Sequence, residues 1–262
     1  MVYFWQNYLP QPIFLSLGPL SIHWYGLILV LAIITASFYT FSSLKRNNFL
    51  SSKKAEDLVF YLIIFGLIGA RFGHVVFFNF NHYFFNPIDV LKVWEGGMSI
   101  QGALLFSFLT LLFWSIKNKV NFLSVADRLV PAVALGQAIG RWGNYFNQEL
   151  YGRPVDWGIP INPINRVSGY ESFNFFHPTF FYESLASLLL FFILHNLAKN
   201  NFKPGVSLFV YFISYGLIRF FMEFVRIDET PDFWGWRLPQ LIAIILPLLI
   251  LALVKFLPKL KK

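Results

Sequence analysis

The sequence has 262 residues, of which 56% are hydrophobic, 20% aromatic and only 13% charged. A soluble domain carries about 25% charged and about 45–50% apolar residues, and a soluble chain this apolar would lack the polar surface to cover its core. This excludes an ordinary soluble protein. The formal net charge of +8 then indicates basic cytoplasmic loops rather than nucleic-acid binding.

Cysteine is absent from the sequence. Its absence excludes disulfides, thiolate metal sites and a cysteine nucleophile belonging to the chain. Any thiol chemistry must therefore use a thiol on a substrate. Residues 1–20 contain no Lys or Arg, so no cleavable signal peptide is expected.

Long apolar runs separated by short polar stretches predict seven transmembrane helices, because a helix needs about 20 mostly apolar residues to cross the hydrocarbon core. The predicted spans are Ile22–Phe41, Leu58–Phe78, Met98–Ile116, Leu129–Phe146, Thr179–Leu197, Val206–Phe224 and Leu238–Leu257. The fourth is the most polar of them, since it contains Gln137, Arg141 and Asn144.

The basic residues orient these spans. With the N-terminus outside, every segment that would lie inside is basic and holds most of the Lys and Arg residues found between spans, as the positive-inside rule requires. Seven spans also place the C-terminus inside. The expected fold is an all-α polytopic membrane protein, N-terminus out and C-terminus in, with residues 1–262 forming a single domain.

One connection is longer than the others. Residues 147–178 are rich in Gly, Pro, Asn and charge, and include Tyr151, Trp157 and Tyr170. Loops of this length are functional or disordered, and the aromatic residues favour order and suit the headgroup layer. This segment is expected to form a small extracytoplasmic cap between the fourth and fifth helices.

Three arginines, Arg71, Arg141 and Arg219, lie within apolar spans. Each costs about 2.5–3.5 kcal/mol on insertion scales, so such residues face a bundle interior or a wet cavity. A structural ion pair, or snorkelling at a helix end, is the alternative for any one of them. Three on separate helices favour a functional role.

The sixth span carries a polar stripe. Tyr215, Arg219, Glu223 and Arg226 follow one another at spacings of four, four and three, which places them within about 80° on one helix face. Glu223 can pair with Arg219 or Arg226, and one arginine would keep charge for an anionic ligand.

The fourth span carries a similar stripe of Gln137, Arg141, Asn144 and Gln148. Guanidinium groups bind phosphate bidentately, and in a membrane the obvious phosphate belongs to a phospholipid headgroup. The glycine pairs Gly136/Gly140 and Gly69/Gly73 have the small-xxx-small spacing that permits close helix contact.

The sequence also resembles the prolipoprotein diacylglyceryl transferase family along nearly its whole length. The matching motifs occur in family order: HWYG at His23–Gly26, GARFGHVVFFN at Gly69–Asn79, WEGGMS at Trp94–Ser99, GRWGNYFNQELYG at Gly140–Gly152, HPTFFYE at His177–Glu183, YGLIRFFMEFVR at Tyr215–Arg226, and Gln240.

The resemblance implies transfer of the diacylglyceryl group of phosphatidylglycerol to the lipobox cysteine of a prolipoprotein, with a thioether formed and glycerol phosphate released. It implies a location in the bacterial plasma (inner) membrane, with the active site toward the outer face. The implied partners are phosphatidylglycerol, a prolipoprotein signal peptide and the bilayer, with no nucleic acid, no metal and no organic cofactor.

The resemblance also implies a set of site residues. It assigns catalytic roles to Arg141, Arg219 and Tyr25, and substrate-binding roles to Arg71, Gln101, Asn144, Glu149, Gly152, Tyr215, Glu223, Arg226 and Gln240. Arg141 and Arg219 would hold the phosphate and stabilise charge on the departing glycerol phosphate. Glu223 with Arg226, and Glu149 with its neighbours, would orient these two arginines. Tyr25 and Asn144 would bind the headgroup, and Gly152 would let the cap pass close to the substrate.

One residue departs from the family pattern. Gln101 stands where the family commonly has His, and Gln cannot carry a proton at neutral pH. Another base, such as His23, Tyr25 or Glu149, is one alternative. The other is that no dedicated base is needed, because guanidinium groups would help a substrate thiol of pKa about 8.5 to ionise.

Other membrane functions fit less well. An anion transporter or channel would show repeat symmetry and broken helices, which the sequence lacks. A retinal-type receptor needs a mid-span Lys, whereas the last span has only Lys255 at its inner end. A voltage sensor would concentrate its arginines on one helix, and a scaffold would not need the polar stripes.

Overall fold

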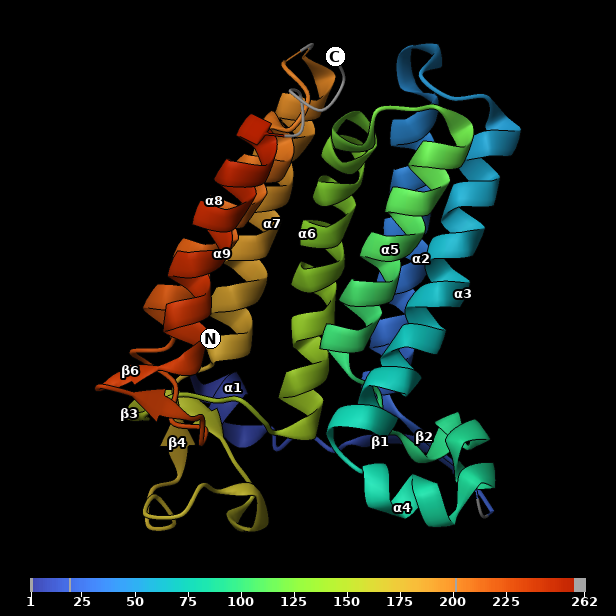
Figure 1. Ribbon diagram of the computed structural model, residues 1–262. Helices are drawn as coiled ribbons and strands as arrows, with labels where there is room; N and C mark the ends of the chain where they lie inside the picture. The colour runs from blue at the N-terminus through green and yellow to red at the C-terminus, as the bar shows by residue number, and fades with distance from the viewer. Residues whose placement is uncertain (1, 19, 201, 257–262) are drawn as a thin grey trace. The chain divides into compact units, whose positions relative to one another are not determined.

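The computed structural model describes residues 2–18, 20–200 and 202–256 (Figure 1). This part of the chain is mostly helical, with three two-stranded sheets among the described residues. In chain order the elements are α1 (Val2–Asn7), β1 (Ile13–Leu17), β2 (Leu20–His23), α2 (Trp24–Lys45), η1 (Arg46–Asn48), α3 (Ser52–Phe77), α4 (Phe80–Phe85), η2 (Pro87–Leu91), η3 (Val93–Glu95), α5 (Ile100–Asn118), α6 (Phe122–Asn147), β3 (Pro154–Pro160), η4 (Pro163–Asn165), β4 (Phe175–Phe176), α7 (Thr179–Lys199), α8 (Val206–Met222), β5 (Asp232–Phe233), β6 (Trp236–Arg237) and α9 (Leu238–Phe256).

The chain divides into two compact units, each described here by itself. The first unit joins Met1–Ala36 with Asp127–Lys262, and the second is Ser37–Ala126. Helix α2 begins in the first unit and ends in the second, while α6 begins in the second and ends in the first. The expectation of a single domain over residues 1–262 stays a prediction.

The helices are those of a multi-pass membrane protein. Five of them, α2, α3, α5, α6 and α7, are long and apolar enough to cross a bilayer, and shorter apolar helical stretches cover Val206–Met222 and Leu238–Leu249. Large apolar side chains such as Phe38, Leu189 and Phe221 are exposed on them, as is usual for helix faces in contact with lipid. A count of seven spans and the orientation of the termini stay predictions.

Several helix boundaries differ from expectation. The predicted second span begins at Leu58, whereas α3 begins at Ser52. The predicted fourth span begins at Leu129, whereas α6 begins at Phe122. The predicted sixth span runs to Phe224, whereas α8 ends at Met222. Hydropathy marks the apolar part of a helix, and it does not detect the polar first turns of α3 and α6.

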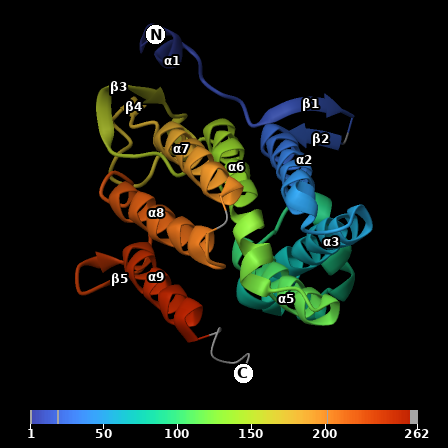
Figure 2. The ribbon, with the colours of Figure 1, turned by 90° about the horizontal axis from the view of Figure 1, so that it is seen from above.

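In the first unit α8 packs between α7 and α9 (Figure 2). Gly216 of α8 makes the contact with α9 close, since a Cβ there would lie 2.7 Å from the carbonyl oxygen of Ala243. This packing places residues near the ends of α7, α8 and α9 beside one another.

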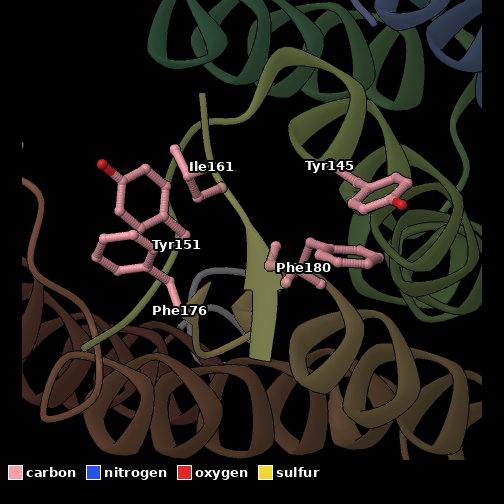
Figure 3. Close-up of a cluster of buried hydrophobic side chains, with 6 residues drawn as sticks. Tyr145, Tyr151, Ile161, Phe176 and Phe180 are labelled. Carbon is pink, nitrogen blue, oxygen red and sulfur yellow. The ribbon is translucent and has the colours of Figure 1, made fainter. Parts of the chain in front are cut away.

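The expected cap over residues 147–178 is an ordered structure with its own apolar core. Strands β3 and β4 pair antiparallel, and α1 packs on β3. Six buried side chains form the core: Tyr145, Tyr151, Ile159, Ile161, Phe176 and Phe180. Figure 3 shows the rings of Tyr145 and Phe180 beside each other, with centroids 4.7 Å apart. This core joins the cap to the ends of α6 and α7.

In the second unit α3 packs closely against α5. Cβ atoms added at Gly69 and Gly73 would lie 2.5 Å from the carbonyl oxygen and 2.8 Å from the Cα of Gly102, so the predicted close contact at this glycine pair is confirmed. The prediction for Gly136/Gly140 is wrong in the described structure. A Cβ at Gly136 would make only an ordinary contact of 3.8 Å, with Ala36, and one at Gly140 would meet nothing within 4 Å.

Candidate active site

Charged side chains from α6, α7, α8 and the segment after α8 gather in the first unit. Glu183 of α7 is almost fully buried, with 2% of its side chain exposed, and Arg141, Arg219 and Arg226 all form ion pairs with it. Arg219 lies 3.4 Å and Arg226 lies 3.3 Å from its Oε1 atom, and Arg141 contacts its Oε2 atom. Three guanidinium groups therefore converge on one carboxylate.

Glu223, at the end of α8, supports this cluster from the other side. Its Oε1 atom accepts a hydrogen bond of 2.5 Å from Arg219, one helical turn earlier, and Arg237 pairs with its Oε2 atom at 3.0 Å. Of the two partners that the sequence allowed for Glu223, Arg219 is confirmed. Arg226 instead pairs with Glu183 and Asp228.

The backbone explains that change of partner. Arg226 lies beyond the end of α8 rather than on its predicted polar stripe, and forms an isolated antiparallel β-bridge with Gly152. Its Nε atom donates to Asp228 at 2.7 Å. Burial acts to lower the pKa of Arg226, but the hydrogen bond and charge of Asp228, with the charges of Glu183 and Glu223, raise the pKa above its ordinary value. The side chain is a buried, permanent cation.

Arg237 connects the start of α9 to the same cluster. It donates to the carbonyl oxygens of Glu223 and Arg226 at 3.1 and 3.0 Å, and also contacts Asp228. Gln240, which is buried, accepts a hydrogen bond of 3.0 Å from the backbone N–H of Arg237. Gln240 thus fixes the chain that carries Arg237, while its predicted contact with substrate stays a prediction.

On α6 the predicted polar stripe continues the network. Asn144 accepts a hydrogen bond of 3.4 Å from Arg141 and donates one of 2.6 Å to Glu149. Gln148 on the same stripe bonds elsewhere, to the carbonyl oxygen of Pro10 and the N–H of Asn162. Asn144 therefore links Glu149 to the arginines, whereas Gln148 holds the cap.

Both predicted tyrosines lie on helices of the first unit. Tyr25 of α2 packs on Gly143, where a Cβ would lie 2.7 Å from its ring. Tyr215 precedes Arg219 by one turn of α8 and stacks on Tyr211, with ring centroids 5.7 Å apart. Gln137 of α6 donates a hydrogen bond of 2.9 Å to the hydroxyl of Tyr211. This hydrogen bond joins the polar stripe of α6 to α8, one turn before Tyr215.

Two predicted site residues, Arg71 and Gln101, belong to the second unit. All five N–H groups of Arg71 donate to backbone carbonyl oxygens, those of Asp89, Val90, Lys92, Gly96 and Gly97, at 2.6–3.2 Å. Its guanidinium carbon also lies 5.1 Å from the centre of the Tyr83 ring. Arg71 therefore holds the loop of residues 89–97 in place. Its predicted contact with substrate would require it to give up hydrogen bonds to these carbonyl oxygens.

Gln101 lies in the first turn of α5. Its Oε1 atom accepts a hydrogen bond of 2.9 Å from Ser99, and the Ser99 hydroxyl accepts one of 3.3 Å from Gly102 N–H, capping the helix. The side chain is exposed and is held by a neutral partner. Its role stays a prediction.

The structure adds three residues that the sequence did not assign to the site: Glu183, Asp228 and Arg237. Glu183 had a readable signal, because a carboxylate in an apolar span is as costly as an arginine. Asp228 and Arg237 lie between α8 and α9, and nothing in their spacing indicated that this segment returns to the charged cluster.

Comparison with known proteins shows the family of the chain. The sequence model of the family described as prolipoprotein diacylglyceryl transferase matches residues 12–256. The chain belongs to the prolipoprotein diacylglyceryl transferase family. It is an enzyme of that family, and its charged cluster is the candidate active site.

Individual relatives share the name phosphatidylglycerol–prolipoprotein diacylglyceryl transferase. One from Parasynechococcus marenigrum is 42% identical over 227 residues, covering 84% of this chain and 81% of the relative. One from Synechococcus elongatus is 35% identical and covers 90% of this chain and 83% of the relative. One from Staphylococcus aureus is 34% identical and covers 95% of this chain and 90% of the relative.

Proposed function

We propose that this chain transfers the diacylglyceryl group of phosphatidylglycerol to the thiol of a lipobox cysteine in prolipoproteins. The convergence of Arg141, Arg219 and Arg226 on one buried carboxylate carries the proposal. A family member that acts on a phospholipid must hold an anionic phosphodiester within the membrane, and guanidinium groups suit that task.

In the proposed reaction the thiolate sulfur attacks the carbon of the diacylglyceryl group that is bonded to the phosphate oxygen. A carbon–sulfur bond forms, the carbon–oxygen bond breaks, and glycerol phosphate leaves with both electrons of that bond. The thiol proton passes to water. Because the phosphate gains negative charge as the bond breaks, donors placed around it stabilise the transition state more than the bound lipid.

Arg141 and Arg219 are the proposed phosphate ligands. About a fifth of each side chain is exposed (18% for both), whereas only 4% of Arg226 is. Arg141 Nη1 has a hydrogen bond of 3.4 Å to Asn144, and Arg219 Nη1 one of 3.4 Å to Glu183. Both donors are at the long limit of hydrogen bonding, so a phosphate oxygen can replace their present acceptors at little cost.

We assign the other predicted residues by their contacts. Asn144 and Tyr25 would meet the headgroup, and Glu149 would orient Asn144, to which it is hydrogen-bonded. Glu223 would orient Arg219. Gly152 and Arg226 would join the cap to the cluster through their β-bridge.

The proposal includes seven spans, with the N-terminus out and the C-terminus in, in the bacterial plasma membrane. Basic segments on one side support the orientation, and the two apolar stretches in α8 and α9 would complete the five longer spans. The active site would then face outward and receive prolipoproteins after their translocation.

Reconstitution of the purified chain with phosphatidylglycerol and a lipobox peptide tests the proposal. We expect the peptide mass to increase by one diacylglyceryl group on a Cys peptide and not on its Cys→Ser counterpart. Phosphatidylcholine replaces phosphatidylglycerol as a donor control. Absence of any mass gain with folded protein would refute the proposed reaction.

Variants of the arginines test the site within that assay. Arg141→Gln should lower kcat on the order of 10²–10³-fold, the cost of removing one donor to a developing anion. Arg153→Gln is the matched control, because Arg153 belongs to the same unit and its side chain is exposed on the cap. Equal activity of the two variants would exclude Arg141 from the reaction.

A further inference from the structure

Glu183 occupies the centre of the charged cluster. It is the last residue of the HPTFFYE motif and lies in the first turns of α7 with 2% of its side chain exposed. Burial of a carboxylate is costly unless it is paired. Its three arginine partners come from α6, α8 and the segment after α8, so a single side chain links three parts of the first unit.

The contacts of Glu183 differ in how readily they can be exchanged. Arg226 is deeply buried and is also held by Asp228 at 2.7 Å. Arg141 and Arg219 are more exposed. In the described residues the Oε2 atom of Glu183 has no hydrogen bond of good geometry, so its contact with Arg141 is an ion pair without directed donors. Arg226 thus anchors Glu183, whereas Arg141 and Arg219 are the more exposed partners and can exchange Glu183 for another acceptor.

Without the carboxylate, the three guanidinium groups would repel one another, and the repulsion is stronger in a site that excludes water. Glu183 offsets this repulsion and keeps the groups together before any anion binds. The carboxylate also uses the same donors that a phosphate would use. A carboxylate and a phosphate both accept paired hydrogen bonds from guanidinium, so Glu183 occupies the place of one acceptor of the ligand.

We propose that Glu183 is a positioning residue that holds Arg141 and Arg219 converged in the absence of lipid and competes with the lipid phosphate for their N–H groups. This proposal rests on the proposed function of the cluster. As charge grows on the departing phosphate, the arginines shift from Glu183 toward it, and after the reaction Glu183 helps to displace the glycerol phosphate.

If Glu183 competes with the ligand, removing it should change the affinity for phosphate in the opposite direction from removing a purely structural ion pair. Loss of a structural contact would loosen the cluster and weaken every ligand. Loss of a competitor would free two guanidinium groups, so the affinity for a phosphate monoester would rise even as the geometry for catalysis deteriorates. The affinity for product and kcat should therefore change in opposite directions.

Two variants of Glu183 separate charge from position. Glu183→Gln keeps the shape but removes the charge, and should lower kcat on the order of 10²-fold, as misplaced catalytic groups do. It should bind glycerol phosphate on the order of tenfold more tightly, which corresponds to about 1.4 kcal/mol. Glu183→Asp keeps the charge on a shorter side chain, and should lower kcat while leaving the affinity for glycerol phosphate near that of the wild type.

Binding is measured on the full chain in detergent, by calorimetry or by the ligand-induced rise in Tm, so this readout does not depend on transfer. The probes are glycerol phosphate, inorganic phosphate, and phosphatidylglycerol in mixed micelles with phosphatidylcholine micelles as reference. Tighter binding of glycerol phosphate and phosphatidylglycerol by Glu183→Gln supports the proposal. Tighter binding of inorganic phosphate alone would overturn the assignment to a lipid headgroup.

Glu56→Gln, an exposed change of the same charge on α3, is the matched control and should behave as the wild type. Wild-type kcat in Glu183→Gln, or weaker glycerol phosphate binding, would overturn the proposal. Should that variant fail to fold, wild-type kcat in Glu183→Asp would overturn it equally. Tighter product binding in a chain that transfers no lipid would instead reject only the proposed function.

Discussion

Gly152 and Arg226 form an antiparallel β-bridge that joins the cap to the end of α8. The N–H of Gly152 donates a hydrogen bond of 3.0 Å to the carbonyl oxygen of His177. The N–H of the next residue, Arg153, donates one of 2.9 Å to the carbonyl oxygen of Val225. The chain at Gly152 therefore lies between two other segments, and the position of Arg226 depends on how closely it passes.

Any side chain at position 152 should disturb this contact. A Cβ there would lie 2.8 Å from the Cβ of His177 and 2.8 Å from the Cγ1 of Val225. Gly152→Ala should therefore displace Arg226 and lower kcat on the order of 10²-fold, with a loss of about 1–3 kcal/mol in the free energy of unfolding. Transfer assays and thermal unfolding in detergent would measure both.

Gly136→Ala is the control for the Gly152 variant. A Cβ at Gly136 would meet only Ala36, at 3.8 Å, and Ala is favoured over Gly in a helix by roughly 0.5–1 kcal/mol. This variant should keep wild-type activity. Equal activity and stability of Gly152→Ala and the wild type would show that the cap does not position Arg226.

Arg71 should respond to substitution as a structural residue. Lys has three donors on one nitrogen, and cannot reproduce the five-donor fork that Arg71 uses on the loop carbonyls. Hydrogen bonds to a charged group contribute about 1.5–3 kcal/mol each, so Arg71→Lys should lower Tm and increase proteolysis within residues 79–98. An unchanged Tm with weaker phosphatidylglycerol binding would instead favour the substrate contact predicted from the sequence.

The helices of this protein were largely readable from the sequence, because apolar runs and transmembrane helices coincide. The early start of α6 is one exception, and it has a specific cause. Asp127 lies before the apolar run and accepts hydrogen bonds from the N–H groups of Gly205 and Leu208, at the beginning of α8. A polar helical turn that caps another helix has no hydropathy signal, so the sequence predicted the apolar part of α6 alone.

The sequence predicted some of the charged residues that meet in the cluster, such as Arg141, Arg219 and Glu223, but missed Glu183 and most of the pairings. Helical spacing allowed Glu223 to pair with Arg219 or Arg226, and the pair with Arg219, one turn away, is the one that forms. The same spacing extended the helix to Arg226, although α8 ends at Met222. Spacing also cannot distinguish an arginine that binds a ligand from one, such as Arg71, whose acceptors are carbonyls of a distant loop.

Gln101 should act as a neutral hydrogen-bonding group rather than as a base. Gln101→Ala should lower kcat/KM by no more than about tenfold, the worth of one uncharged hydrogen bond. In the wild type the rate should then rise with pH through the thiol range of the peptide, without a step near the ordinary His pKa of about 6.5. The measurement is the pH profile of kcat/KM.

Gln101→His is the informative companion variant. If position 101 contacts the reacting atoms, an imidazole there should add a step near pH 6.5 to the profile, with higher activity at neutral pH. A wild-type profile that already shows this step would mean that another residue serves as base. An unchanged profile in Gln101→His would place position 101 outside the reaction.

His177 should make the stability of the protein depend on pH. It precedes α7, its Nδ1 atom lies 3.1 Å from the hydroxyl of Tyr182, and burial lowers the pKa of its imidazole below the ordinary value. In the unfolded chain a His has a pKa of about 6.5, so at acidic pH the unfolded state binds more protons. The free energy of unfolding should therefore fall as the pH drops from about 6.5 to the lower pKa of His177 in the folded protein. Above pH of about 6.5 the contribution of His177 should be constant.

The difference in Tm between the wild type and His177→Gln, followed from pH 8 to pH 5, isolates this contribution from those of the other histidines. A difference that does not vary with pH would mean that His177 is protonated equally in the folded and unfolded chains.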